Sequence, residues 1–297
     1  EMILSPAKLN ISLNVNSLLD NGYHSISSYV FFLDLFDKLY IEKSSFNSVI
    51  VSGLFKDDLI NNGGDTIVNK SINFCKNHYK INQNLIIKLE KNIPVSAGLG
   101  GGSANSASVI RYFLSKSESR NIITNEAAQL SASLGSDVPA CLYSRPLIME
   151  GRGEKTTLIE FNDKLDIGVV LINPKIQLST KKVFNNFILK KPIRRKKPIL
   201  KIKTISDLCS ISKLGNDLVK SAIEIVPEVS NILDLFKENN TCLSCGMSGS
   251  GATCYGIFHS KKEAIDFKKI IVKAKETKGY WIWTGGLLKK RDLILAE

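Results

Sequence analysis

The hydrophobic and polar positions repeat over short distances along the chain and predict several strands. Asn10 to Val15 and Leu85 to Lys91 alternate polar and apolar residues, which is typical of strands with one buried face. Apolar runs at Val30 to Leu35 and at Leu39 to Glu42 are separated by a short polar interruption at Asp37. We interpret these two runs as a pair of strands, because a polar interruption between apolar runs is typical of a turn.

Helical spacing occurs between these strands. Apolar residues within Thr66 to Lys76 recur three to four positions apart, whereas Ile167 to Ile172 is continuously apolar and predicts a strand buried on both faces. Strands and helices are mixed without strict alternation, so the pattern favours the α+β class. We place a domain boundary in the polar stretch Glu160 to Asp166, which predicts an N-terminal domain over 1–160 and a C-terminal domain over 161–297.

Composition is ordinary for a globular protein, with 43% hydrophobic and 23% charged residues, and excludes a wholly disordered chain. No apolar run is long enough to span a membrane, and no secretory signal is visible. The six cysteines lie mostly in apolar stretches, which predicts reduced thiols in the cytoplasm. Cys242 and Cys245 form a lone C-x-x-C without a second pair, so we expect no protein-held metal site.

The net charge of +12 raises the possibility of a polyanionic partner. The densest basic run, Lys190 to Lys197, has no interleaved aromatic residues and no recognition motif, which favours a solvated loop over a nucleic-acid patch. A basic chain also suits a small phosphorylated substrate. We therefore expect a small-molecule partner and no nucleic acid or membrane, and keep a non-catalytic nucleotide- or RNA-binding module as the competing interpretation.

The segment Pro94 to Asn105 is the most unusual in composition. It carries four glycines between positions 98 and 102, follows a predicted strand and precedes a helix that begins near Ser103. Free N–H groups at a helix N-terminus bind phosphate, and glycines let the backbone approach a ligand closely. The segment matches neither the Walker A nor the dinucleotide-binding signature. The pattern favours a phosphate cradle over a plain flexible turn.

Further polar residues have two interpretations each. Lys8 and Asn10 lie on the same side of the first predicted strand, where both could also simply face solvent. Asp137 stands in a helix-start pattern, for which an ordinary N-cap is the favoured interpretation on the residues alone. Tyr23 and His24 follow a turn and are, as a lone pair, more typical of packing than of recognition.

Taken together, these segments resemble the GHMP kinase superfamily. The resemblance implies two domains, an N-terminal ribosomal-S5-domain-2-like one and a C-terminal ferredoxin-like one, with the active site in the cleft between them. The matching segments occur in the family's order and span most of the chain: Pro6 to Asn10, Gly22 to His24, Pro94 to Asn105, Leu134 to Pro139, Met149 to Glu154 and Gly246 to Thr253.

Two of these segments narrow the resemblance to one branch of the family. Gly22-Tyr-His24 and Met149 to Glu154 are similar to members that use ATP and Mg²⁺ to phosphorylate the 2-hydroxyl of 4-diphosphocytidyl-2-C-methyl-D-erythritol, in the non-mevalonate route to isoprenoids. A GHMP kinase for another small alcohol, such as homoserine or mevalonate, is the alternative within the same class. The oligomeric state, monomer or homodimer, is left open.

The resemblance also implies roles for individual residues. Asp137 is expected to act as general base, with Lys8 beside it and beside the transferring phosphoryl group. Ala104 replaces a serine usual in the family, and Ser96-Ala97 replaces common glycines. The nucleotide is expected to contact Pro94, Val95, Ser96, Ala97, Gly98, Leu99, Gly100, Gly101, Gly102, Ser103 and Ala104, with Lys91 near the adenine. On the substrate side the resemblance implies Asn10 at the erythritol, Tyr23 and Phe184 stacked on the cytosine, His24 at its edge and Thr180 nearby.

Overall fold

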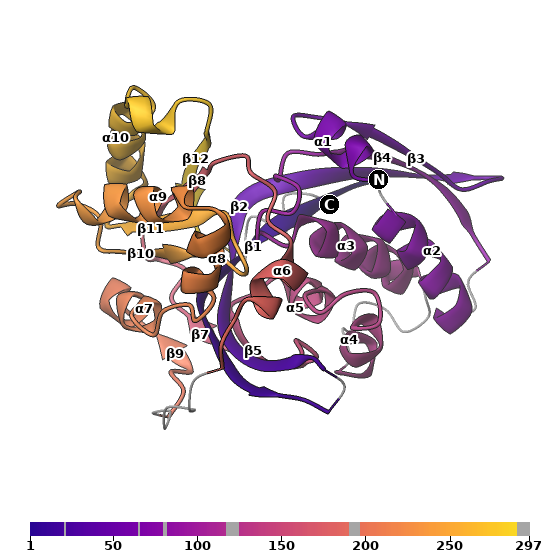
Figure 1. The fold of residues 1–297 in the computed structure, drawn as a ribbon. Coiled ribbons are helices and arrows are strands. Elements are labelled where there is room, and N and C mark those ends of the chain that lie inside the picture. The colour runs from indigo at the N-terminus through magenta and orange to yellow at the C-terminus, as the bar shows by residue number, and fades with distance from the viewer. Residues whose placement is uncertain (21, 65, 80–81, 117–124, 190–196, 290–297) are drawn as a thin grey trace.

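The computed structural model describes residues 1–20, 22–64, 66–79, 82–116, 125–189 and 197–289. A first sheet contains β1 (Met2–Leu18), β2 (His24–Ser44), β3 (Ser48–Ser52), β4 (Asn84–Glu90), β5 (Leu147–Gly151) and β6 (Lys155–Leu158). Its order is β3-β4-β2-β5-β6, and β1 pairs with β2 along nearly the whole length of both strands. The β1–β2 pair forms a long curved ribbon through the middle of the molecule (Figure 1).

The predicted pair of strands around Asp37 is wrong, because β2 is a single strand from His24 to Ser44. The polar residue at this point does not turn the chain. Asp37 is fully buried and accepts hydrogen bonds from the backbone N–H groups of Asn92 and Ile93, at 2.7 and 2.8 Å. A buried carboxylate with partners is tolerated inside a strand, and those partners come from a segment distant in sequence.

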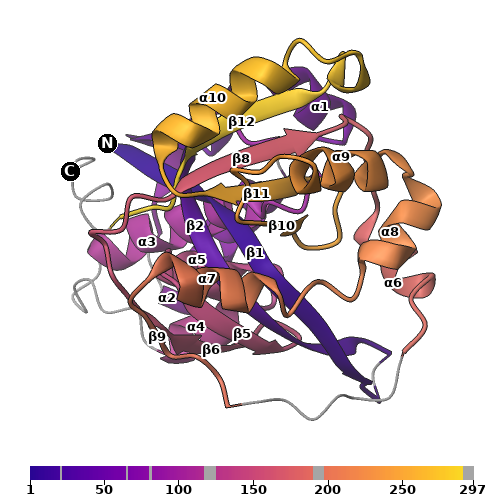
Figure 2. The ribbon, with the colours of Figure 1, turned by 90° about the vertical axis from the view of Figure 1, so that its left-hand side faces the viewer.

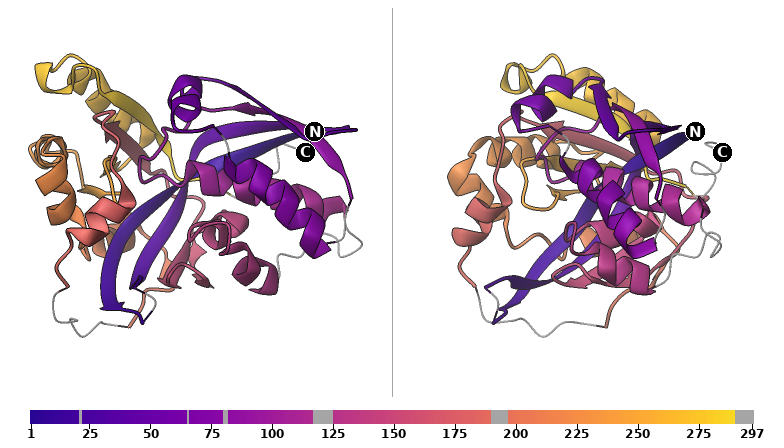
Figure 3. Two further views of the ribbon diagram at one scale, coloured as in Figure 1. Left: turned by 45° about the vertical axis from the view of Figure 1, so that its right-hand side comes forward. Right: turned by 90° about the vertical axis from the view of Figure 1, so that its right-hand side faces the viewer.

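Helices cover one face of this sheet, as the two views of Figure 3 show. They are α2 (Thr66–Tyr79), α3 (Gly101–Lys116), α4 (Asn125–Ser131) and α5 (Val138–Tyr143), while α1 (Lys56–Asn61) follows β3. The central helix α3 is buried along most of its length and contacts α2, α5 and β1. Its small residues allow this close approach, since Ser106 and Ser108 pair with Ser71 and Ser5, each at 2.7 Å between hydroxyl oxygens.

A second, antiparallel sheet follows the order β10-β11-β8-β12. Its strands are β8 (Gly168–Asn173), β10 (Ser244–Met247), β11 (Cys254–Phe258) and β12 (Trp281–Gly286). Every residue of β8 is buried, which confirms the strand predicted from its continuous apolar run. Helix α10 (Lys261–Ile271) lies across this sheet, above the β1–β2 ribbon (Figure 2).

The remaining elements lie outside these two sheets. They are β7 (Glu160–Phe161), α6 (Thr180–Asn185), β9 (Lys201–Ile202), α7 (Ile205–Ser212), α8 (Val219–Ile225), α9 (Glu228–Lys237) and the 3₁₀ helix η1 (Lys275–Thr277). Strands β7 and β9 pair with each other as a separate two-stranded sheet. The first sheet ends at Leu158 and the second begins at Gly168, so we keep the division into 1–160 and 161–297 as a proposal. The mixture of sheets and helices confirms the α+β class predicted from the sequence.

Candidate active site

A cleft of about 1430 Å³ lies between the glycine-rich segment, the start of α5 and the start of α6. Most of the residues predicted to bind ligands line it. Leu99 and Ala104 are exceptions, because both side chains are buried in the core. The substitution of serine by Ala104 therefore removes no hydroxyl from the cleft. The lining residues among those predicted are Lys8, Asn10, Tyr23, His24, Lys91, Pro94, Val95, Ser96, Ala97, Gly98, Gly100, Gly101, Gly102, Ser103, Asp137, Thr180 and Phe184.

Lys8 and Asp137 meet in this cleft although they come from opposite ends of the N-terminal domain. The Lys8 Nζ lies 3.0 Å from Asp137 Oδ2 and also donates to Asn10 Oδ1. Asn10 in turn donates through Nδ2 to the Ser28 hydroxyl at 2.7 Å. Lys8 and Asn10 are both buried, so the alternative that they face solvent is wrong. Their shared side of β1, predicted from strand periodicity, is confirmed.

Asp137 stands at the N-cap of α5, as its sequence pattern indicates, but it does not cap the helix. Its side chain accepts no hydrogen bond from the first turn of α5. The favoured interpretation of an ordinary cap is therefore wrong for the carboxylate. Instead, one carboxylate oxygen pairs with Lys8 while a quarter of the side-chain surface stays exposed to the cleft. The position of the backbone was predictable, whereas the direction of the side chain was not.

The glycine-rich segment is held at its middle by the first strand and by the second domain. The Lys8 N–H donates to the Leu99 carbonyl oxygen at 2.8 Å, and the Ser248 hydroxyl donates to the Gly98 carbonyl oxygen at 2.8 Å. Gly98 and Gly100 have φ of +77° and +63°. A Cβ at Gly98 would lie 2.2 Å from the Ser248 carbonyl oxygen, so only glycine fits there. Helix α3 then begins at Gly101 with its N-terminus in the cleft.

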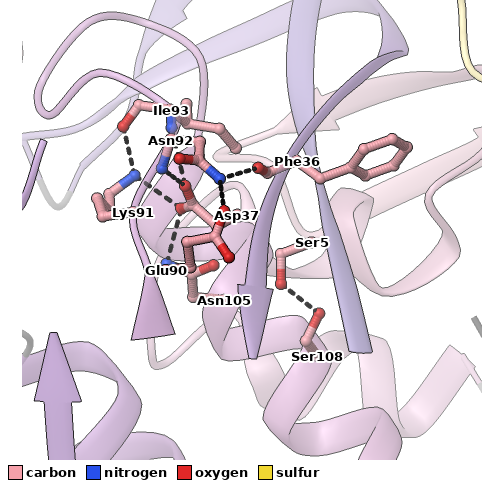
Figure 4. Close-up of polar contacts among 9 residues, drawn as sticks. All are labelled: Ser5, Phe36, Asp37, Glu90, Lys91, Asn92, Ile93, Asn105 and Ser108. Carbon is pink, nitrogen blue, oxygen red and sulfur yellow. Dashed lines mark hydrogen bonds and ion pairs between the residues drawn. The ribbon is translucent and has the colours of Figure 1, made fainter. Parts of the chain in front are cut away.

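A second lysine lies under the same segment in a closed network (Figure 4). Lys91 Nζ pairs with Asp37 Oδ2 at 2.7 Å and donates to the Ile93 carbonyl oxygen. Asn105 Nδ2 adds a hydrogen bond to the same carboxylate oxygen at 3.0 Å. Lys91 still lines the cleft, but Asp37 balances its charge. Its contact with adenine therefore stays a prediction.

The aromatic residues expected at the cytosine have other partners here. Phe184 is stacked on His24, with ring centroids 5.2 Å apart and 30° between the planes. The Arg152 guanidinium carbon lies 4.2 Å from the centre of the Tyr23 ring. A Tyr23–Phe184 sandwich is thus not preformed, and it stays a prediction. Thr180 reaches across to Ser250, with 2.8 Å between the hydroxyl oxygens.

Burial keeps the Cys141 thiol protonated. Cys141 on α5 is buried, and burial followed by the charge of Asp137 raises the pKa of its thiol to about 12.

Among the residues that the structure describes, no cluster of three or more His, Cys, Asp or Glu side chains could hold a metal ion. Of the basic run Lys190 to Lys197, residues 190–196 lie outside the described residues. No helix in the described part of the chain is long and apolar enough to cross a membrane.

Sequence reasoning missed three residues at or beside this cleft: Arg152, which lines it, and Asp37 and Ser248, which hold neighbouring backbone in place. Asp37 was assigned to a turn, and no local signal shows that it supports the glycine-rich segment. Ser248 lies in a segment singled out for its resemblance, yet only the folded chain places its hydroxyl against Gly98. Arg152 lies between two glycines in another such segment, and its flanking glycines were the available signal.

Comparison with known proteins now decides the family. Residues 66–145 match the GHMP kinases N terminal domain, and residues 199–276 match the GHMP kinases C terminal domain. The 4-diphosphocytidyl-2-C-methyl-D-erythritol kinase of Anaplasma marginale (strain Florida) is 37% identical to this chain. The matched region covers 89% of this chain and 90% of that enzyme. The enzyme of the same name from Ehrlichia ruminantium (strain Gardel) is 33% identical, covering 95% and 96%. The chain belongs to the GHMP kinase family, in the branch of these enzymes.

Solved structures of GHMP kinases share its fold. The crystal structure of a 4-(cytidine 5'-diphospho)-2C-methyl-D-erythritol kinase has a TM-score of 0.74 at 21% identity, covering 97% of this chain and all of that one. A mevalonate kinase structure reaches 0.68 at 15% identity with the same coverage of both chains. These likenesses confirm the predicted two-domain GHMP kinase fold.

Proposed function

We propose that this protein transfers the γ-phosphoryl group of ATP to the 2-hydroxyl of 4-diphosphocytidyl-2-C-methyl-D-erythritol. The observation that carries the proposal is the Lys8–Asp137 pair in the cleft, next to the glycine-rich segment. Relatives with 33–37% identity over most of the chain bear the name of this activity. A small-molecule kinase needs a base, a cation and a phosphate cradle, and the cleft contains side chains suited to each task.

Asp137 is the proposed general base. Its side chain is partly exposed to the cleft, and its recorded partner among the described residues is Lys8. An acceptor with free lone pairs can take the proton of the substrate hydroxyl as the oxygen attacks phosphorus, which contributes roughly 10²–10⁴-fold. Asn10 holds Lys8 from the other side, so the ammonium has a fixed position beside the base.

Lys8 and the glycine-rich segment would stabilise the transferring phosphoryl group. Charge in this reaction spreads over the phosphoryl oxygens, so a fixed cation and backbone N–H groups near them lower the barrier. The Lys8 side chain packs against Gly100, where an added Cβ would lie 3.1 Å from Lys8 Cβ and Cε. The cation and the cradle are therefore parts of one packed unit.

The described residues fit ATP with magnesium. Gly100, Gly101 and Gly102 line the cleft without side chains, at the N-terminus of α3, where phosphate binds well. Asn105 also lines the cleft, and its buried Oδ1 has no hydrogen-bond partner in the described part of the chain, which suits a donor group on the nucleotide. Mg²⁺ usually keeps waters and phosphate oxygens, with few protein ligands. Ser103 would supply a hydroxyl to it, and the ion would neutralise phosphate charge.

The test is turnover with the named substrate. The purified protein, incubated with ATP, Mg²⁺ and 4-diphosphocytidyl-2-C-methyl-D-erythritol, should release ADP and yield a product phosphorylated at the 2-hydroxyl, as ³¹P and ¹H NMR would show. Homoserine and mevalonate, offered in the same way, should give no ADP above the Asp137→Asn variant. ADP release with mevalonate or homoserine alone would assign the protein to another member of the GHMP kinases.

A further inference from the structure

The turn between β5 and β6 has a fixed shape. Gly151 and Gly153 have φ of +70° and +120°, which side chains other than glycine rarely adopt. The Glu154 carboxylate folds back and accepts a hydrogen bond from the backbone N–H of Arg152 at 2.7 Å. A Cβ at Gly151 would lie 2.4 Å from Glu154 Oε1. These contacts orient Arg152 at the tip of the turn.

The same turn packs against the backbone that carries the proposed base. A Cβ at Gly153 would lie 2.1 Å from the Ser136 carbonyl oxygen, so the turn touches the residue immediately before Asp137. Gly153 is buried at this contact. The position of Arg152 is therefore tied to that of Asp137 through one backbone contact.

On its other side the turn reaches the aromatic residue expected at the cytosine. The Arg152 guanidinium carbon lies 4.2 Å from the centre of the Tyr23 ring, and both residues line the cleft. No carboxylate among the described residues forms an ion pair with Arg152. A guanidinium stacked on a ring keeps its N–H groups at the edge, where they can bind a planar pair of anionic oxygens.

We propose that Arg152 binds the diphosphate of the cytidylyl substrate and so selects a nucleoside diphosphate over a nucleoside; this rests on the proposed function. The substrate has its cytosine at one end, the erythritol 2-hydroxyl at the other and the diphosphate between them. Tyr23 is expected at the cytosine and Asp137 at the hydroxyl. Arg152 contacts the Tyr23 ring, and its neighbour Gly153 contacts Ser136, the residue before Asp137. The guanidinium therefore lies where the diphosphate must pass.

Lys181 and Lys182 on α6 are the competing cations, since both line the cleft and are exposed, as Arg152 is. An ammonium on a flexible exposed stem loses more freedom on binding than a stacked guanidinium does. Lys182→Met therefore serves as the test of the competing assignment. Lys155→Met is the matched control, because Lys155 lies three residues after Arg152, is exposed and does not line the cleft.

The experiment measures binding of cytidine and of cytidine diphosphate to the full chain by isothermal titration calorimetry. Cytidine diphosphate should bind the unaltered protein more tightly than cytidine. Arg152→Met should weaken the binding of cytidine diphosphate by about ten- to a hundredfold, the usual range for a lost charge-assisted hydrogen bond. The same variant should weaken the binding of cytidine by a much smaller factor. Arg152→Lys should recover part of the loss, and Lys155→Met should bind both probes like the unaltered protein. Thermal unfolding would show that each variant is folded.

Four results would overturn the inference. Equal loss of both probes in Arg152→Met would show that the arginine acts through Tyr23 alone. Loss of the preference in Lys182→Met but not in Arg152→Met would assign the diphosphate to α6. If the unaltered protein binds cytidine diphosphate no more tightly than cytidine, the protein has no diphosphate subsite. The inference and the proposed function can fail separately. Absent turnover with a persisting preference for cytidine diphosphate would contradict only the proposed function. An unchanged KM for the cytidylyl substrate in Arg152→Met would contradict only the inference.

Discussion

Two lysine–aspartate pairs lie on either side of the glycine-rich segment and differ in what else each aspartate contacts. In the open pair, Lys8–Asp137, one carboxylate oxygen binds the ammonium and the side chain is 25% exposed to the cleft. In the closed pair, Lys91–Asp37, the aspartate side chain is fully buried. A carboxylate has about four lone-pair sites, and Asp37 fills them with Lys91, Asn105 and two backbone N–H groups.

The difference teaches that an ion pair gains a chemical role from the acceptor sites left vacant. Asp37 has no site for a substrate proton, so it can only hold the β4 end, the glycine-rich segment and α3 together. Asp137 makes no helix-cap bond and faces the cleft, so its remaining lone pairs are available. The two pairs also touch different glycines, since Gly100 packs against Lys8 and Gly101 against Lys91.

The largest expected effect breaks the open pair. Asp137→Asn should lower kcat by roughly 10²–10⁴-fold, because the amide cannot accept the hydroxyl proton. The free energy of unfolding should fall less than in Asp37→Asn, because Asp137 is partly exposed, whereas Asp37 is fully buried and also accepts hydrogen bonds from Asn105 and two backbone N–H groups. Steady-state ADP release and urea unfolding measure the two quantities. A variant that keeps its kcat would remove Asp137 from the reaction.

The next effect breaks the closed pair. Asp37→Asn should lower the free energy of unfolding by about 3–5 kcal/mol, because it leaves the buried Lys91 ammonium without its counter-charge. Urea unfolding with an unchanged slope would measure this loss. Asp34→Asn, which removes a partly exposed carboxylate of the same strand, is the matched comparison and should cost less. If both variants unfold alike, Asp37 is not the structural member of the comparison.

Adjacent glycines should separate the two pairs on a smaller scale. Gly100→Ala forces an alanine to a φ of +63° and crowds Lys8, so kcat/KM should fall by roughly tenfold or more through misplacement of the cation. Gly101→Ala places a Cβ 3.0 Å from Lys91 Nζ and should act mainly on stability, by about 1–3 kcal/mol. Kinetics and urea unfolding of both variants, with Gly63→Ala as an exposed comparison, would show whether the effects divide in this way.

The smallest effect concerns the thiol beneath the open pair. Burial and the Asp137 charge raise the pKa of Cys141 to about 12, so the thiol stays protonated at pH 8. Native protein should therefore show no alkylation of Cys141 by iodoacetamide at pH 8, while unfolded protein reacts. Mass spectrometry of peptides from both states measures this. Rapid native labelling would mean that the floor of the Asp137 site is open to water.

Much of the fold could be predicted from local pattern. The buried strand β8, the start of α3 and the shared side of Lys8 and Asn10 follow from periodicity, because a buried face selects apolar residues at the period of its element. The break predicted in β2 failed, because periodicity treats Asp37 as an interruption and cannot know that a distant segment supplies its hydrogen bonds. Arg152 was visible between its glycines but had no role without its neighbours.

The sequence by itself determined the family resemblance, the class of the fold and the position of the glycine-rich segment before α3, since these depend on local patterns along the chain. Only the tertiary structure decided which lysine meets which aspartate, and which carboxylate faces the cleft. The physical reason is that hydrogen bonding and burial depend on distances in space. The helix-start aspartate therefore faces the cleft instead of capping α5, and the strand aspartate is buried with four partners instead of marking a turn.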